Sequence, residues 1–167
     1  MLHYLFDWGN TLMTDIPGNT GPMCDWPEIQ VEPHARETLR LVSHHVHCHL
    51  ATNADDSNEK EVRSALMRAG LSDWIRNIFC SHEIGHEKPS SHFFDFVVTA
   101  LNAPRSDLLM VGDNLEKDVM GALANGLHAI WYNRKRARVP SNVVAVSDLI
   151  DLIPMVQKGG VKVCLQP

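Results

Sequence analysis

The sequence lacks a long hydrophobic run, a paired-cysteine motif and an excess of basic residues. No apolar stretch approaches the roughly 20 residues that a helix needs to span a bilayer. No basic segment precedes the first apolar run, so a signal peptide is not expected either. The four scattered cysteines, without a CxxC pair, favour reduced thiols in a cytoplasmic protein over a disulfide framework. The net charge of −5 argues against nucleic acid or an anionic membrane as a partner.

The composition of the 167 residues is otherwise ordinary for a soluble globular protein, with 44% hydrophobic and 21% charged side chains. This length suffices for one domain and is short for two. Neither an internal repeat nor a low-complexity tract divides the chain. We therefore expect residues 1–167 to form a single domain.

Short apolar runs alternate along the chain with segments of helical periodicity. Asp56 and Glu59 resemble a capping box at the start of a helix that Gly70 ends. A later apolar stripe contains Phe93 and Phe96. Such alternation is typical of an α/β fold, with a Rossmann-like parallel sheet of five to six strands and helices on both faces. The predicted strands cover residues 2–6, 46–51, 78–80, 108–111, 128–131 and 143–146.

One stretch interrupts this alternation. Residues 13–32, MTDIPGNTGPMCDWPEIQVE, contain three prolines and two glycines and show no periodic pattern. This composition predicts a loop or small flap over the ends of the strands. The segment is too short to form an independent cap domain.

Polar side chains follow four of the predicted strands. In an open parallel sheet, ligands bind beyond the carboxyl ends of the strands, so these side chains are expected to meet at one edge. They offer a carboxylate after the first strand, a hydroxyl and an amide after the second, an ammonium after the third and two acids after the fourth. In chain order they are Asp7, Thr52, Asn53, Lys88, Asp113 and Asp118.

Four motifs carry these residues: FDWGNTLM, GHEKPSSHFF, LLMVGDNLEKDVMGALANG and IWYNR. Their order and spacing resemble those of the haloacid dehalogenase-like (HAD-like) superfamily, which consists mostly of phosphatases with a Rossmann-like core. The resemblance runs from Leu2 to Asn133. It implies a HAD-like core domain in which residues 13–32 stand in place of a cap.

Phosphoryl transfer needs a nucleophile and positive charge around the transferring group. Asp7 is the only acid at the end of the first strand, so we assign it as the nucleophile that forms an aspartyl-phosphate. Lys88 is expected to neutralise the developing charge and to keep Asp7 ionised. Thr52 and the backbone N–H of Asn53 are expected to bind the transferring phosphate together with Lys88.

A magnesium ion is expected beside the nucleophile, because this hard cation prefers oxygen ligands. Asp7 and Asp113 would hold the ion together with the backbone carbonyl of Gly9, and Asp118 would orient Asp113 or a bound water. Each acid also has a structural alternative. Asp7 is compatible with an Asx-turn, and Asp113 and Asp118 are compatible with the cap and the first turn of a helix.

Gly9 stands where phosphatases of the resembled family usually have a second aspartate, which acts as general acid and base. General acid–base catalysis typically contributes about 10²–10⁴-fold to a rate. Three interpretations follow: a phosphohydrolase that is weak or takes its acid from elsewhere, a protein that binds a phosphorylated ligand or partner without turnover, or a relative with dehalogenating or phosphonate-cleaving chemistry. Asp15 and Asp25 on the flap are candidates for the missing acid. Asn10 tolerates a left-handed turn but cannot act as a base.

Three further patterns leave alternatives open. His45, His47 and His49 alternate along an extended segment, which suits either a transition-metal site or a partly exposed row of histidines. His82 and His86 precede Lys88 and are candidates for substrate contact or proton transfer. The basic run RKRAR at residues 134–138 suits a solvated loop or contact with a large anionic substrate. The expected partner is a phosphorylated small molecule or macromolecule, and an uncapped site also suits a homo-oligomer.

Overall fold

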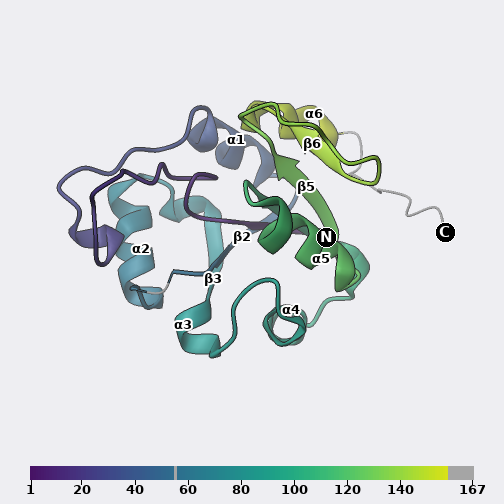
Figure 1. The fold of residues 1–167 in the computed structure, drawn as a ribbon, viewed down its shortest axis with the longest axis horizontal. Helices are drawn as coiled ribbons and strands as arrows, with labels where there is room; N and C mark the ends of the chain where they lie inside the picture. Colours follow the sequence, from purple (N-terminus) through teal and green to yellow (C-terminus); the bar gives the residue numbers. More distant parts are fainter. Residues whose placement is uncertain (55, 158–167) are drawn as a thin grey trace.

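A six-stranded, fully parallel sheet forms the centre of the protein (Figure 1), described here by a computed structural model covering residues 1–54 and 56–157. The strand order is β3-β2-β1-β4-β5-β6. The predicted α/β class, with a Rossmann-like parallel sheet, is confirmed. The strands are β1 (His3–Phe6), β2 (His47–Thr52), β3 (Ile75–Cys80), β4 (Leu108–Gly112), β5 (His128–Tyr132) and β6 (Val144–Val146).

β1 lies in the middle of the sheet because its side chains are apolar on both faces. Tyr4 and Phe6 belong to the core on one face and Leu5 to the core on the other, and all three are fully buried. β1 pairs with β2 on one side and with β4 on the other. The strand order therefore reverses between β1 and β4, and a crevice opens there beyond the carboxyl ends of the strands.

Helices cover both faces of the sheet, as predicted. α1, α2 and α6 contribute to the core that contains Tyr4, whereas α4, a π-helix and α5 contribute to the core that contains Leu5. The helices are α1 (Ala35–Val42), α2 (Glu59–Arg68), α3 (Ser81–Ile84), α4 (Ser91–Leu101), the π-helix (Leu115–Met120), α5 (Gly121–Ala124) and α6 (Leu152–Gln157). Short 3₁₀ turns cover Met23–Asp25, Ser72–Trp74, Arg105–Asp107 and Leu149–Asp151.

Three local predictions differ from the structure. The capping box of α2 is formed by Asn58 and Glu61 rather than by Asp56 and Glu59. The side chain of Asn58 accepts from the N–H of Glu61, and the side chain of Glu61 accepts from the N–H of Asn58. β3 begins at Ile75, three residues earlier than predicted, because exposed Arg76 and Asn77 on this edge strand interrupt its apolar run.

The buried stripe of α4 also differs from the prediction. Phe93, Phe94 and Val97 are buried, whereas Phe96 is 49% exposed. A stripe with Phe96 and a stripe with Phe94 both have helical spacing. The buried face of α4 contains Phe94, which is adjacent to Phe93 in the chain. Periodicity alone did not distinguish the two alternatives.

The flap at residues 13–32 lies beside α2 (Figure 1) and contains only one short 3₁₀ turn. Trp26 of the flap belongs to the same core as α2, and Arg68 of α2 donates to the carbonyl of Cys24. The ends of the flap are paired, because the N–H of Thr14 donates to the backbone carbonyl of Gln30 and the N–H of Glu32 donates to the backbone carbonyl of Leu12. The segment is therefore an anchored loop.

Across residues 1–54 and 56–157, every helix is too short or too polar to cross a membrane.

Gly121 at the start of α5 provides a test of this packing. A Cβ atom at this position would lie 2.5 Å from the Cβ atom of Pro89 and 3.0 Å from its Cα atom. Gly121→Ala is therefore expected to lower the free energy of unfolding by about 1–3 kcal/mol through overpacking, measured by urea denaturation. Alanine in a helix without this contact would raise that free energy by about 0.5–1 kcal/mol. A lower free energy of unfolding would therefore confirm that α5 and Pro89 are this close, and a higher one would contradict it.

Candidate active site

The turn after β1 presents the carboxylate of Asp7 at the edge of the sheet. The N–H of Asp7 donates to the carbonyl of Val111 at 2.9 Å, so the residue continues the pairing of β1 with β4. The carbonyl of Trp8 accepts from the N–H groups of Leu12 and Met13, both at 3.0 Å, which ends the extended segment. Asn10 has a φ of 56°, the left-handed conformation that its side chain tolerates.

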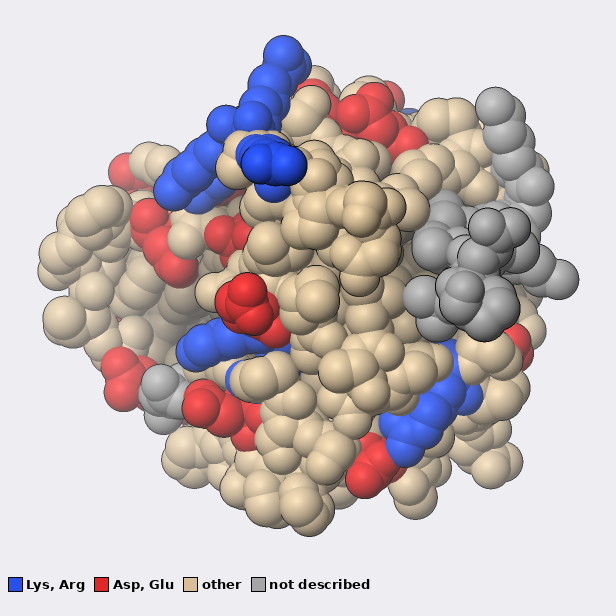
Figure 2. All heavy atoms as spheres, turned by 45° about the vertical axis from the view of Figure 1, so that its right-hand side comes forward, with Lys and Arg blue, Asp and Glu red and all other residues tan. Residues whose placement is uncertain are grey.

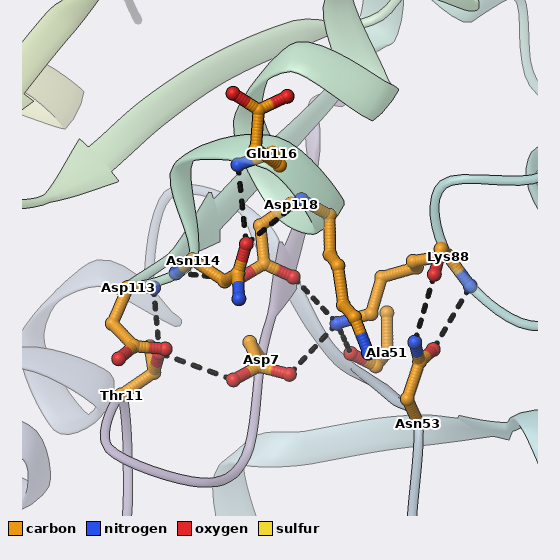
Figure 3. A network of polar contacts seen from close by, with 10 residues as sticks. Asp7, Thr11, Ala51, Asn53, Lys88, Asp113, Asn114, Glu116 and Asp118 are labelled. Carbon is orange, nitrogen blue, oxygen red and sulfur yellow. Dashed lines mark hydrogen bonds and ion pairs between the residues drawn. The ribbon is translucent and has the colours of Figure 1, made fainter.

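Thr11 connects the turn after β1 to the loop after β4 (Figure 3). Its hydroxyl donates to Oδ2 of Asp7 at 3.3 Å and accepts from the N–H of Asp113 at 3.1 Å. Thr11 is fully buried, so both bonds are protected from water. This role of Thr11 was not predicted from the sequence, although its position four residues after Asp7 in FDWGNTLM is visible there.

Lys88 carries the only buried ammonium group of the described residues, and its side chain is 1% exposed. Its Nζ atom donates to Oδ1 of Asp7 at 2.7 Å, to Oδ1 of Asp118 at 2.7 Å and to the carbonyl of Ala51 at 2.6 Å. An ammonium group has three protons, so these acceptors engage all of them. Lys88 therefore acts on Asp7 directly, and a bound phosphate would have to replace one of the three acceptors.

Asn53 holds the backbone of Lys88 in place (Figure 3). Its Oδ1 atom accepts from the N–H of Lys88, and its Nδ2 atom donates to the carbonyl of the same residue, both at 2.9 Å. Neighbouring Thr52 is buried at the end of β2. The side chain of Asn53 thus positions the loop that contains Lys88. This role was not predicted from the sequence.

Asp118 lies in the π-helix and faces Lys88. Its second carboxylate oxygen accepts from the N–H of Asn114 at 3.0 Å, and the side chain of Asn114 caps the helix by accepting from Glu116 and Lys117. Gly112 permits this close approach, since a Cβ atom there would lie 2.2 Å from Oδ2 of Asp118. Asp118 therefore holds Lys88 and the turn after β4 at the same time.

The charges at the site are mostly negative. Burial and the nearby charge of Asp7 raise the pKa of Asp113 to about 6, although Arg134 and Lys88 oppose this rise. Burial and Asp7 also raise the pKa of Asp118, against the opposing effect of Lys88. For Lys88, burial alone would lower the pKa, but the charges of Asp7 and Asp118 outweigh burial and raise it. The lysine therefore stays charged.

This donor set fits a magnesium ion. One carboxylate oxygen from each of Asp7, Asp113 and Asp118 lies within 4.8 Å of the other two. Hard oxygen donors are the ligands that magnesium prefers, and an added cation would relieve the repulsion that raises the pKa of Asp113.

All seven residues predicted for the site border one open pocket of about 290 Å³. The pocket also contacts Asp15 of the flap and Lys117 of the π-helix, which gives it an additional acid and an additional cation. The seven are Asp7, Gly9, Thr52, Asn53, Lys88, Asp113 and Asp118. The remaining residues around it are Trp8, Asn10, Asp15, Met23, Ala54, Asn114 and Lys117.

Other candidate residues lie elsewhere. Asp25, His82 and His86 are exposed and do not border this pocket, and the ring of His86 stacks on that of His92. The charged side chains in Figure 2 are of both signs and interspersed, without a broad basic surface. The first arginine of the basic run, Arg134, is not simply solvated, because it forms an ion pair at 2.7 Å with buried Glu32.

Comparison with known proteins agrees with this geometry. Residues 86–142 match the HAD-hydrolase-like family model. An uncharacterised protein from Listeria monocytogenes superposes over 95% of this chain and 99% of its own, with a TM-score of 0.82 and 28% identity. The ribulose-1,5-bisphosphate 5-phosphatase of Halopiger xanaduensis is 35% identical over 64% of this chain and 44% of its own. The matched family model and the similar solved structures are those of HAD-like hydrolases, and this chain resembles them in sequence and in fold.

A magnesium-bound relative extends the comparison of folds. YfnB of Bacillus subtilis, described as a HAD-hydrolase bound to magnesium, superposes over 77% of this chain and 56% of its own, with a TM-score of 0.68 and 22% identity. At this identity the likeness shows the fold alone. The alignment with the curated phosphatase from Halopiger also covers less than half of that relative's length.

The buried ammonium of Lys88 gives a test of the site. Lys88→Met leaves Asp7 and Asp118 without their shared cation, so the free energy of unfolding is expected to fall by about 3–5 kcal/mol at pH 7 with EDTA. The deficit should shrink as the pH falls toward 5, because the folded protein then takes up protons on acids whose pKa is raised above the unfolded value. Urea unfolding measures both effects.

Lys117→Met is the matched control, because this lysine borders the same pocket but is exposed. Its effect on unfolding should stay within about 0.5 kcal/mol. Equal effects of the two substitutions on the free energy of unfolding would contradict the role of Lys88 as the buried cation that Asp7 and Asp118 share.

Proposed function

We propose that the protein is a magnesium-dependent phosphohydrolase that acts through an aspartyl-phosphate on Asp7. The observation that carries this proposal is the setting of the Asp7 carboxylate, which borders the pocket and is bonded to the ammonium of Lys88 and the hydroxyl of Thr11. An ionised carboxylate held in a fixed orientation is prepared for attack on phosphorus. The curated relative from Halopiger is a phosphatase, which supports the same class of reaction.

The other residues have complementary roles in the proposal. Lys88 keeps Asp7 ionised and supplies positive charge, while Thr52 and the backbone N–H of Asn53 bind the transferring phosphate. Asp7, Asp113 and the carbonyl of Gly9 would hold the metal, and Asp118 would orient Asp113 or a bound water. A bound magnesium ion would supply further positive charge to the phosphoryl oxygens.

The proposed substrate is a phosphate monoester, on a small molecule or a macromolecule. The pocket is open, and among the described residues the flap contributes Asp15 and Met23 to its border. A large substituent on the phosphate can therefore extend into solvent. The scattered cysteines support the cytoplasm as the place of action.

Binding of a phosphorylated ligand without turnover is the second candidate function. The observation in its favour is Gly9, which provides no carboxyl group at the position where the family's general acid usually lies. A turnover measurement separates the two functions.

Asp7→Asn tests the proposed function directly. With para-nitrophenyl phosphate and magnesium, this variant is expected to lose on the order of 10³-fold or more in kcat/KM, because amide nitrogen and oxygen do not replace the nucleophile. EDTA should abolish wild-type turnover. Beryllium fluoride, an aspartyl-phosphate mimic, should bind wild type and not the variant, as observed by fluorine NMR.

Asp25→Asn is the control for this experiment, because it removes an exposed flap carboxylate that does not border the pocket. Persistent turnover in Asp7→Asn would show that the nucleophile is misassigned. An inert wild type that still binds phosphate or beryllium fluoride would favour the binding function.

A further inference from the structure

The space next to Gly9 is occupied by another carboxyl group of the same chain. A Cβ atom built on Gly9 would lie 2.8 Å from each carboxylate oxygen of Asp15. The carboxyl of Asp15 therefore lies where the side chain of an acidic residue at position 9 would extend. Asp15 also borders the pocket that contains Asp7 and Lys88.

Asp15 is oriented by specific contacts, although it lies on an exposed flap. Asn10 donates through Nδ2 to Oδ2 of Asp15 at 2.9 Å, and its Oδ1 atom accepts from the N–H of Asp15 at 3.3 Å. Arg134 donates to the same Oδ1 atom at 2.7 Å. Because the guanidinium group of Arg134 can only donate, the Asn10 atom beside it has to be Oδ1. The Nδ2 atom of Asn10 therefore faces Asp15.

The other acids that border the pocket already have partners or roles. Asp118 is bonded to Lys88 and to the N–H of Asn114, and Asp7 is bonded to Lys88 and Thr11. The remaining acid, Asp113, belongs to the donor set that fits the metal. Among the described residues around the pocket, Asp15 is thus the carboxyl group available for proton transfer.

We propose that Asp15 is the general acid and base of this enzyme, in place of the acid that position 9 lacks. This inference rests on the proposed phosphohydrolase function. In the first step, an oxygen of Asp7 bonds to phosphorus, the bond from phosphorus to the ester oxygen breaks, and that oxygen takes the proton of Asp15. In the second step, water gives a proton to Asp15 as its oxygen bonds to phosphorus, and the bond from phosphorus to Asp7 breaks.

Asp15→Asn tests the role through its dependence on the leaving group. With β-glycerophosphate, whose alkoxide leaving group needs a proton, kcat/KM is expected to fall by about 10²–10⁴-fold. With para-nitrophenyl phosphate, whose leaving group is stable without a proton, the fall should be much smaller. A merely structural role for Asp15 would lower both rates by the same factor, as would misfolding. Asp25→Asn, the exposed flap control, should leave both rates unchanged.

A relocation of the acid provides a second test. Gly9→Asp alone places two carboxyl groups in one space, so no gain in activity is expected. The double variant Gly9→Asp/Asp15→Gly removes this conflict and should recover activity toward β-glycerophosphate relative to Asp15→Asn. The backbone at Gly9 lies outside the left-handed region, so aspartate does not strain it.

The outcomes separate this inference from the proposed function. If Asp15→Asn equals wild type on both esters while Asp7→Asn is inactive, Asp15 is not the acid and the proposed function stands. If the loss in Asp15→Asn is the same on both esters, or the double variant recovers nothing, the inference is also overturned. Turnover that survives in Asp7→Asn, or is missing from wild type, refutes the proposed function and this inference with it.

An independent observation concerns three histidines away from the pocket. His3 of β1 pairs in register with His47 of β2, and His49 lies two residues further along β2 on the same face. Nδ1 of His3 lies 3.0 Å from Nε2 of His49. One ring nitrogen from each of the three lies within 4.8 Å of the other two. Exposed His45 from the sequence pattern is not a member of this group, and His3 takes its place.

We infer that these three imidazoles form a site for a divalent transition metal such as zinc. Imidazole nitrogen suits zinc, and three histidines on two adjacent, paired strands form a rigid set of ligands. Burial lowers the pKa of His49 to about 4 and also lowers the pKa of His3 and His47, so the rings are neutral at pH 7 and need not release a proton to bind.

Zinc titration by calorimetry in excess magnesium, which saturates the carboxylate site, tests this inference. Wild type is expected to bind one equivalent of zinc, and His47→Gln is expected to lose this equivalent. His45→Gln is the matched control and should bind zinc as wild type does. Equal zinc binding by wild type and His47→Gln, or its loss in the control, would overturn the site.

Discussion

The ammonium of Lys88 is the interaction on which the site depends. It lies between Asp7 at the end of β1 and Asp118 in the π-helix, and it also bonds to the carbonyl of Ala51 in β2. A buried charge is tolerated only when its partners replace the lost water, and three acceptors at 2.6–2.7 Å meet this requirement. The same contacts fix the Asp7 carboxylate, so the stability of this region and the reactivity proposed for Asp7 would have one cause.

The flap is positioned by a second buried charge. The carboxylate of Glu32 accepts from the hydroxyl of Thr14 and from Arg134, both at 2.7 Å, and from the hydroxyl of Tyr132 at 3.3 Å. It thereby joins both ends of the flap to the end of β5. Through Arg134 and Asn10 this arrangement continues to Asp15. The flap thus contributes an oriented acid to the border of the pocket, which stays open.

In the proposed mechanism Asp15 takes the place of the acid that position 9 lacks, which would complete the set of groups for phosphoryl transfer. In the proposed mechanism the nucleophile and the metal ligands lie on the rigid ends of strands, whereas the proton donor lies on a loop. Activity would then depend on the order of the flap as well as on the sheet. In that mechanism the ion pair between Arg134 and Glu32 would also affect activity, although neither residue borders the pocket.

The sequence by itself determined the alternation of strands and helices and seven of the residues that border the pocket. Buried parallel strands require continuous apolar runs, and their carboxyl ends lie at one edge, so both features were readable from local patterns. Only the tertiary structure decided that Asn58 caps α2, that Phe94 rather than Phe96 is buried, and that Asp15 lies beside Gly9. Those outcomes depend on contacts between residues whose spacing in the chain carries no periodic signal. For the same reason the partnership of His3 with His47 and His49 became visible only when β1 and β2 were paired.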